Sequence, residues 1–233
     1  MERSLIVARM GTVDYAAATA LQDALVRARQ SDAIGDILLI LEHPHVFTLG
    51  RGAQESFLLE PIPGVPIHRV SRGGEVTYHG PGQLVGYPII KLEGAARDIG
   101  KYLRALERVL INALGAAGLA AEQRDGFTGV WVGTRKIASI GVGIRRWVTF
   151  HGFALNVAPD LAYFNAMVPC GIAGCEMTSM AALGNTDTNA TVGSFAPLVE
   201  SAFVEAFGYG RAVAADVDSI RRLVDDPALN CEA

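Results

Sequence analysis

The sequence is poor in the features that mark several large classes of protein. It has only three cysteines in 233 residues, and an odd number argues against a disulfide scaffold. Its longest purely aliphatic run is "ILLIL" at 37–41, which is far too short to cross a bilayer. We therefore expect a protein that neither depends on disulfides nor enters a membrane.

An excess of basic charge is also missing. The formal net charge is −4, so the composition gives no electrostatic support for nucleic-acid binding. The first residues, "MERSLIVARMGTVDY", lack the length and cleavage pattern of a secretory signal. Half of the residues are hydrophobic and 19% are charged, which is typical of soluble globular proteins. We expect a cytoplasmic protein.

No repeat or Ser/Gly-rich linker divides the chain, so we expect a single domain over 1–233, with its informative motifs between about 37 and 180. Apolar residues at helical spacing predict helices over 14–29, 98–118 and 194–207. In the second helix the apolar stripe begins at Ile99, and in the third Ser194 is the expected N-cap, with Pro197 in the first turn.

Short apolar segments punctuated by Gly and Pro predict the strands: "DILLILEH", "PIHRV", "QLVGYPII", "GVWVG", "KIASIGVGI" and "WVTFHGFALNV". These segments come in runs rather than alternating with helices. The pattern therefore favours an α+β fold, a mixed or antiparallel sheet with helices packed on it.

The stretch "RGGEVTYHGPGQLVGYPI" at 72–89 predicts a loop that a ligand could approach closely. Four glycines in "RGGEVTYHGPG" leave the backbone unshielded and free to take positive φ. Arg72, Tyr78 and His79 add a cation, an amphipathic ring and a titratable group. A purely structural Gly-rich hairpin is the competing interpretation, and the stretch matches no phosphate-loop or dinucleotide motif.

Lys136 and His151 are further candidates. Lys136 precedes a strand-like run of small residues, where a lysine is usually a solvated charge. Beside a cysteine, however, its ammonium would favour the thiolate and lower the thiol pKa from about 8.5 into or below the neutral range. His151, in "FHGFALNV", is more often a structural histidine than a catalytic one, so we hold it as a secondary candidate.

The two cysteines of "PCGIAGCEMTSM" at 169–180 do not suit a metal site, because no second ligand pair lies nearby and Cys231 is almost at the chain end. A redox dithiol usually has two residues between its cysteines. One nucleophile is left, and Cys170 has the better setting between Pro169 and a small glycine. A carboxylate follows Cys175, which would disfavour a thiolate there.

Three stretches together resemble the lipoyl(octanoyl) transferases: "RGGEVTYHGPGQLVGYPI", "KIASIGVGIRRWVTFHGFALNV" and "PCGI" followed by "TSM". The resemblance runs from "LILEHPHVFTLGRG" to "TSM" and implies the catalytic domain shared with lipoate and biotin protein ligases, a mixed sheet flanked by helices. It implies a catalytic pair, Cys170 as the nucleophile and Lys136 as its activator and acid/base, with no metal and no cofactor. The implied substrate-binding residues are Arg72, Gly73, Gly74, Glu75, Val76, Thr77, Tyr78, His79, Ser139, Ile140, Gly141, Gly152, Phe153 and Ala154.

The resemblance also implies an activity and its partners. An octanoyl group would pass from acyl carrier protein, through a Cys170 thioester, to a lysine of a lipoyl domain, as in lipoate biosynthesis. The implied acceptors are the lipoyl domains of 2-oxoacid dehydrogenase complexes and the glycine cleavage H protein. Backbone N–H groups at Cys170–Gly171 would hold the oxyanion. Candidates for a basic docking patch are Arg72, Arg145 and Arg146.

Two alternatives remain beside this activity. One is an ATP-dependent lipoate or biotin protein ligase on the same fold, which would need no essential cysteine. The other is a non-catalytic module that binds an acyl group or a protein. The presence of Cys170 together with Lys136 favours the transferase.

Overall fold

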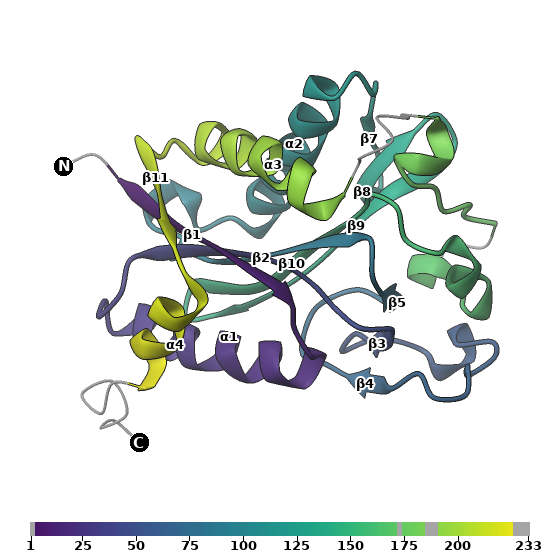
Figure 1. Ribbon diagram of the computed structural model, residues 1–233, viewed down its shortest axis with the longest axis horizontal. Helices are drawn as coiled ribbons and strands as arrows, with labels where there is room; N and C mark the ends of the chain where they lie inside the picture. The colour runs from purple at the N-terminus through teal and green to yellow at the C-terminus, as the bar shows by residue number, and fades with distance from the viewer. Residues whose placement is uncertain (1–2, 172–173, 185–190, 226–233) are drawn as a thin grey trace.

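The computed structural model describes residues 3–171, 174–184 and 191–225. Their main feature is an eight-stranded mixed sheet in the order β11-β1-β2-β6-β10-β9-β8-β7, beside a three-stranded sheet in the order β4-β3-β5 (Figure 1). The elements are β1 (Ser4–Thr12), α1 (Tyr15–Gln30), β2 (Asp36–Glu42), β3 (Val46–Leu49), η1 (Glu55–Phe57), β4 (Ile67–Arg69), β5 (Val76–His79), β6 (Gln83–Ile89), η2 (Gly94–Ala96), α2 (Ile99–Ala116), β7 (Glu122–Arg124), β8 (Phe127–Val132), β9 (Arg135–Arg145), β10 (Val148–Asn156), η3 (Leu161–Ala166), η4 (Pro169–Gly171), η5 (Ala181–Leu183), α3 (Val192–Phe207), β11 (Arg211–Ala215) and α4 (Val217–Asp225).

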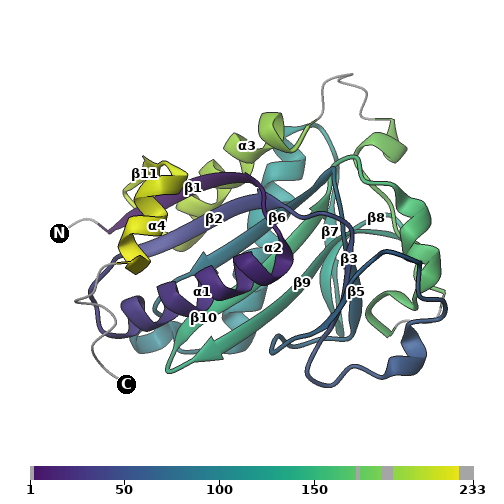
Figure 2. The same ribbon diagram turned by 60° about the horizontal axis from the view of Figure 1, so that its bottom comes forward.

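Helices cover both faces of the large sheet. α2 and α3 pack together on one face, while α1 and α4 lie on the other (Figures 1 and 2). β6 and β10 are buried along their whole length, because a central strand between two helical layers has no exposed face. β1 pairs in parallel with β2 and β11, and the other neighbours are antiparallel. The expected α+β fold with a mixed sheet is confirmed.

The three predicted helices are present, with corrections at their ends. Thr191, not Ser194, caps α3, and the Ser194 side chain completes a capping box as the third helical residue. Pro197 consequently lies in the second turn rather than the first. Ile99 was expected to begin the buried stripe of α2, yet it is 49% exposed.

Five strands and one helix were missed from the sequence: β1, β3, β5, β7, β11 and α4. The error that matters most for the site is β5, which lies inside the stretch that we predicted to be a loop. β5 pairs antiparallel with β3, so neighbouring side chains over 76–79 point to opposite sides. Flanking glycines and a length of four residues hide this alternation in the sequence.

A tight hairpin joins β9 to β10 and aligns the two strands that form one wall of the site. Its turn residues, Arg146 and Trp147, both have positive φ, 49° and 64°, as a two-residue type I′ turn requires. Neither residue is glycine or asparagine, so the turn carries no sequence signal of its own. Among the described helices, none is long and apolar enough to cross a membrane.

Candidate active site

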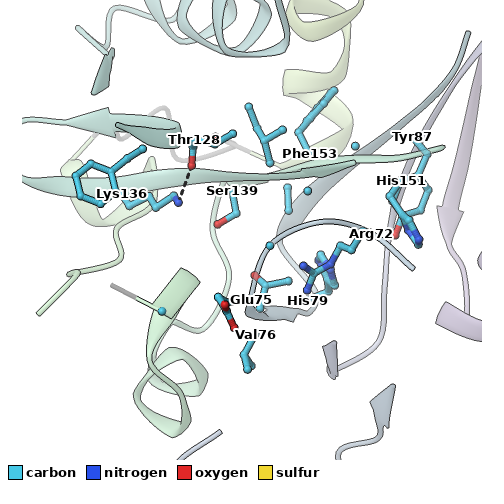
Figure 3. A pocket seen from close by; sticks show the side chains of 18 of the residues that line it. Arg72, Glu75, Val76, His79, Tyr87, Thr128, Lys136, Ser139, His151 and Phe153 are labelled. Atoms are coloured by element: carbon cyan, nitrogen blue, oxygen red, sulfur yellow. Dashed lines mark hydrogen bonds between the residues drawn. The ribbon is translucent and has the colours of Figure 1, made fainter. Parts of the chain in front are cut away.

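A cavity of about 410 Å³ lies between the large sheet and the small one (Figure 3). Strands β9 and β10 form one side of it, and the segment 72–79 that ends in β5 forms the other. Ile140, Phe153 and Ala154 supply carbon surface to its walls. Gly171, next to Cys170, reaches the same cavity from η4.

Close backbone contacts hold the segment 72–75 against β9. The Gly73 N–H donates to the Val142 carbonyl at 2.8 Å. A Cβ on Gly50 would lie 1.9 Å from the Gly74 carbonyl oxygen, so this crossing requires glycine at position 50. The two sheets are thereby joined at one edge of the cavity.

Arg72 is buried beneath this segment and does not reach solvent. Its guanidinium donates to the carbonyl and the hydroxyl of Thr48 at 2.9 and 2.7 Å, and to the Gly73 carbonyl at 3.0 Å. The side chain lines the cavity, but with 6% exposure it cannot form part of a docking patch. That part of the sequence interpretation is wrong, because the small sheet closes over the residue.

Lys136 lies in β9 at one end of the cavity and is 1% exposed. Its Nζ donates to the Thr128 carbonyl at 3.0 Å and lies 4.8 Å from the centroid of the Trp131 ring (Figure 3). A Cβ on Gly129 would lie 2.6 Å from Lys136 Cε, so only glycine leaves room for the lysine chain. Of the two alternatives that the sequence left open for Lys136, a solvated charge and a buried amine, this burial excludes the first.

The segment that follows Cys170 is attached to the backbone of Lys136. The Lys136 N–H donates to the Glu176 carbonyl, and the Thr178 N–H donates to the Lys136 carbonyl, both at 2.8 Å. These bonds bring the cysteine-containing stretch beside β9. The side chain of Cys170 itself lies outside the described residues.

The Gly171 N–H, which we considered for an oxyanion site, donates to the Val168 carbonyl at 3.1 Å. It is therefore already engaged within η4. Cys175 is half-buried and lines a different hollow, bordered by Leu59, Phe164 and Met167.

The opposite end of the cavity is polar and aromatic, with Arg72, His79, Tyr87 and His151 close together (Figure 3). Burial lowers the pKa of His151 to about 3 and that of His79 well below its usual value. Burial likewise raises the pKa of Tyr87 well above its usual value. At neutral pH this end is therefore lined by uncharged imidazole and phenol groups around the Arg72 cation.

Hydrogen bonds position His151 at this end of the cavity and His43 behind it. His151 has a positive φ of 52°, and its backbone N–H donates to Gln22 Oε1 on α1 at 2.7 Å. His43, behind Tyr87, donates from Nδ1 to the Val13 carbonyl and accepts from the Tyr87 hydroxyl at Nε2, both at 2.7 Å. Burial lowers the pKa of His43 to about 4.

Most of the site residues expected from the sequence are brought together in this one cavity. The lining includes Lys136, Arg72, Gly74, Glu75, Val76, Thr77, His79, Ser139, Ile140, Gly141, His151, Gly152, Phe153 and Ala154. Gly73 is absent from this lining and serves to attach the segment to β9. Tyr78 is a correction: it points away from the cavity, fully buried against Phe164 and Tyr163, because it alternates with Thr77 and His79 along β5.

The sequence interpretation missed several residues around the cavity. Tyr15, Tyr87, Gly126, Phe127 and Thr128 line it, and the fully buried Glu107 on α2 accepts a hydrogen bond from the Gly129 N–H, next to Thr128. Glu107 left a signal, an acidic residue among the apolar positions of the helix. Among the described residues, no group of three or more His, Cys, Asp or Glu could hold a metal ion.

Known proteins resemble the chain in sequence and, at lower identity, in fold. A protein of Solibacter usitatus named octanoyltransferase is 51% identical over 187 residues, which cover 78% of this chain and 84% of its own. One of Gloeobacter violaceus with the same name is 46% identical over 209 residues, covering 89% of this chain and 92% of its own. Both alignments cover more than four fifths of the relative.

The solved structures share the fold at much lower identity. Lipoate-protein ligase A bound with ATP superposes with a TM-score of 0.70 at 14% identity, covering 100% of this chain and 96% of its own. A bipartite lipoate protein ligase from Thermoplasma acidophilum superposes with a TM-score of 0.67 at 15% identity, covering 100% and 93%. The lipoate ligase-like fold expected from the sequence is confirmed. Residues 14–204 match the lipoyl protein ligase A/B catalytic domain, and the chain belongs to that family.

Proposed function

We propose that this protein is an octanoyltransferase of lipoate biosynthesis, which moves an octanoyl group from acyl carrier protein to a lysine of a lipoyl domain through a thioester on Cys170. The enzyme class is supported by relatives of that name at about half identity over most of both chains. The observation that carries the mechanism is the cavity itself, which Lys136 and Gly171, the neighbour of Cys170, both line beside carbon-rich walls.

In the first step, the Cys170 thiolate attacks the carbonyl carbon of the octanoyl thioester. The bond from that carbon to the carrier's sulfur breaks, and the Lys136 ammonium gives its proton to the departing thiolate. The products are an acyl-cysteine and a neutral Lys136 amine. Buried methylenes of the octanoyl chain contribute about 0.8 kcal/mol each along the walls.

In the second step, the neutral amine of the target lysine attacks the acyl-cysteine. The carbon–sulfur bond breaks, Cys170 leaves as thiolate, and Lys136 takes the proton that the attacking nitrogen releases. An amide replaces a thioester, so the transfer runs downhill and requires no ATP. The thiolate and ammonium pair is regenerated for the next cycle.

The proposed acceptors are lipoyl domains, including those of 2-oxoacid dehydrogenase complexes and the H protein. Phe127 and Thr128 are exposed residues of the cavity lining near Lys136, so the target lysine would enter past them. We place the enzyme in the cytoplasm, where a reactive thiol stays reduced. Arg145, whose side chain also pairs with Asp23, and the exposed Arg146 remain the candidates for contact with an acidic carrier.

Intact-protein mass spectrometry with octanoyl-acyl carrier protein and no ATP tests the proposal. We expect an octanoyl adduct on the wild type and on Cys175→Ser, and none on Cys170→Ser. An adduct that persists on Cys170→Ser would overturn the assignment of the nucleophile. Activity that appears only with free octanoate and ATP would instead identify a ligase.

The role of Lys136 is tested with Lys136→Met, which keeps the length of the chain and removes its charge. We expect the transfer rate to fall by about 10²–10⁴-fold, and alkylation of Cys170 to require higher pH. Lys101→Met, at an exposed position of α2, is the matched control. An unchanged alkylation midpoint in Lys136→Met would show that Lys136 does not activate the thiol.

A further inference from the structure

We infer that Glu107 is a positioning residue for Lys136, acting through the peptide unit between Thr128 and Gly129. The inference rests on the proposed role of Lys136 as the acid and base of the reaction. Glu107 does not touch the cavity. It acts on the group that holds the lysine ammonium.

Glu107 is an ionisable residue in an apolar place. It is fully buried on α2, among helix positions that otherwise supply the hydrophobic core. A carboxylate there loses its hydration, and an apolar side chain of similar size would pack at no such cost. Packing alone therefore does not explain an acid at this position.

Both oxygens of the carboxylate are bonded. The Gly129 N–H donates to Oε1 at 3.0 Å, and Arg104 Nη1 donates to Oε2 at 2.7 Å. The Arg104 side chain is 39% exposed, so it carries the compensating charge towards solvent. The other oxygen of the carboxylate accepts from one backbone amide, that of Gly129, which follows the cavity-lining Thr128.

That amide shares its peptide bond with the acceptor of Lys136. The Thr128 carbonyl, which receives the Lys136 Nζ at 3.0 Å, and the Gly129 N–H are the two ends of one planar unit. Hydrogen bonds at both ends of a peptide polarise it and strengthen each other. Glu107 thus makes the Thr128 carbonyl a stronger acceptor for an ammonium and fixes its direction.

This arrangement requires glycine at position 129 and is sensitive to rotation of the peptide unit. Its φ of 137° is one that other residues rarely adopt, and a Cβ would lie 2.6 Å from Lys136 Cε. The peptide is therefore held by Glu107 on one side and closely packed by the lysine chain on the other. A small rotation of this unit would redirect the carbonyl away from Nζ.

The other charged side chains on the elements around α2 reach solvent or other partners. Arg124 donates to the Gly133 carbonyl, and Glu200 pairs with Arg9. The remaining ones are exposed or half-exposed: Lys101 and Arg108 of α2, Glu122 of β7, Arg135 and Arg145 of β9, and Glu205 of α3. Among the described residues, Arg104 and Glu107 are the charged side chains bonded on the α2 side of this peptide, whereas Glu75 and Arg72 line the cavity that Lys136 faces and are the same in all the variants compared below.

The opposite charges of Glu107 and Arg104 predict that replacing them has opposite effects on the protonation of Lys136. Glu107→Gln keeps an oxygen for the Gly129 N–H but removes the negative charge, so the Lys136 ammonium becomes less favoured. Arg104→Gln removes the compensating positive charge, so the ammonium becomes more favoured. If Glu107 and Arg104 had only a structural role, both substitutions would lower stability. They would not shift the titration of Lys136 in opposite directions.

The test follows Lys136 directly by NMR in protein labelled with ¹³C at the lysine ε-carbon. The sequence contains only three lysines, Lys91, Lys101 and Lys136, so Lys136→Met assigns the signal and the exposed Lys101 serves as an internal reference. We expect the pH midpoint of the Lys136 signal to fall by about half a unit to one unit in Glu107→Gln and to rise in Arg104→Gln. Glu205→Gln, on exposed α3 surface, should change nothing.

The pH profile of octanoyl transfer should move in the same two directions. Equal midpoints in all variants, or shifts of the same sign in Glu107→Gln and Arg104→Gln, would overturn the inference. Should Glu107→Gln not fold, Arg104→Gln alone still decides, because its predicted shift has a definite sign. The NMR titration needs no turnover, so its failure is distinguishable from failure of the proposed function, which the Cys170 adduct reports.

Discussion

The Nδ1 atom of His79 lies 2.7 Å from the side-chain oxygen of Gln83. The amide nitrogen of Gln83 donates to the Tyr78 carbonyl and to Asn156 Oδ1, at 3.2 and 2.9 Å, so its oxygen must face the histidine. Nδ1 of His79 therefore carries the proton, and Nε2 keeps its lone pair. Burial, with help from His43, holds the pKa of His79 well below its usual value, and the imidazole stays neutral.

Replacing Gln83 by Glu would favour the charged form of His79 over the neutral one. A carboxylate beside Nδ1 favours the imidazolium, and the bonds to Tyr78 and Asn156 are lost. We expect a higher KM for the octanoyl donor, because a charge then borders the acyl cavity, and a stability loss of about 1–3 kcal/mol. Kinetics and thermal unfolding measure the two effects.

Gln123→Glu, at an exposed position of β7, is the matched control for that substitution. It should leave both the KM and the stability unchanged. If Gln83→Glu behaves like the control, the tautomer of His79 does not matter for substrate binding.

Stability should decrease as the pH falls from about 6.5 towards 4. His43 and His151 have pKa values of about 4 and about 3 because they are buried, whereas an unfolded histidine titrates near 6.5. Between these values the unfolded chain binds more protons than the folded one, so acid favours unfolding. Above pH 7 both states are neutral at these positions, and this contribution is fully present.

Thermal unfolding from pH 7.5 to pH 4.5 measures this dependence. His151→Asn should reduce the slope, and asparagine tolerates the positive φ of that position. His68→Asn, at a half-buried histidine of the small sheet, is the comparison. An equal slope in wild type and His151→Asn would show that His151 does not contribute.

Ala154→Val should shift the acyl chain preference towards shorter groups. Ala154 lines the cavity from β10, and two added methyl groups occupy space that the chain would fill. Loss of about two buried methylenes, at about 0.8 kcal/mol each, lowers the preference for octanoyl over hexanoyl roughly tenfold. Competition between the two donors measures the ratio.

A change of the same size outside the cavity separates this effect from general overpacking. Ala202→Val lies in the buried face of α3 and should lower stability without changing the ratio. An unaltered octanoyl preference in Ala154→Val would place the acyl chain elsewhere.

Arg146→Asn should stabilise the protein by up to about 1 kcal/mol. Arg146 is exposed and has a φ of 49° in the hairpin turn, and asparagine adopts this conformation with less strain. Chemical denaturation measures the gain. Arg146→Ala, which keeps the strain, should give none, and a similar gain in both variants would point to charge rather than backbone conformation.

Local patterns in the sequence predicted much of the fold. Leu25 and Ala28, at helical spacing, marked α1, and the apolar run at 37–41 marked β2, because side-chain periodicity reflects burial on one face or two. Short elements were missed. β5 has four residues between glycines, too few to show an alternation, and the prediction that Tyr78 faces the ligand failed with it.

The sequence by itself determined which chemical groups are available: a cysteine between proline and glycine, one lysine at a strand entrance, and a Gly-rich stretch able to pack closely. Only the tertiary structure decided what surrounds them. Glu107 meets Gly129 across 22 positions, and Gln83 meets Asn156 across 73. Such contacts depend on which faces of distant elements pack together, and no local pattern encodes that. The hydrogen bonds that orient Lys136 and His79 therefore became visible only in the folded chain.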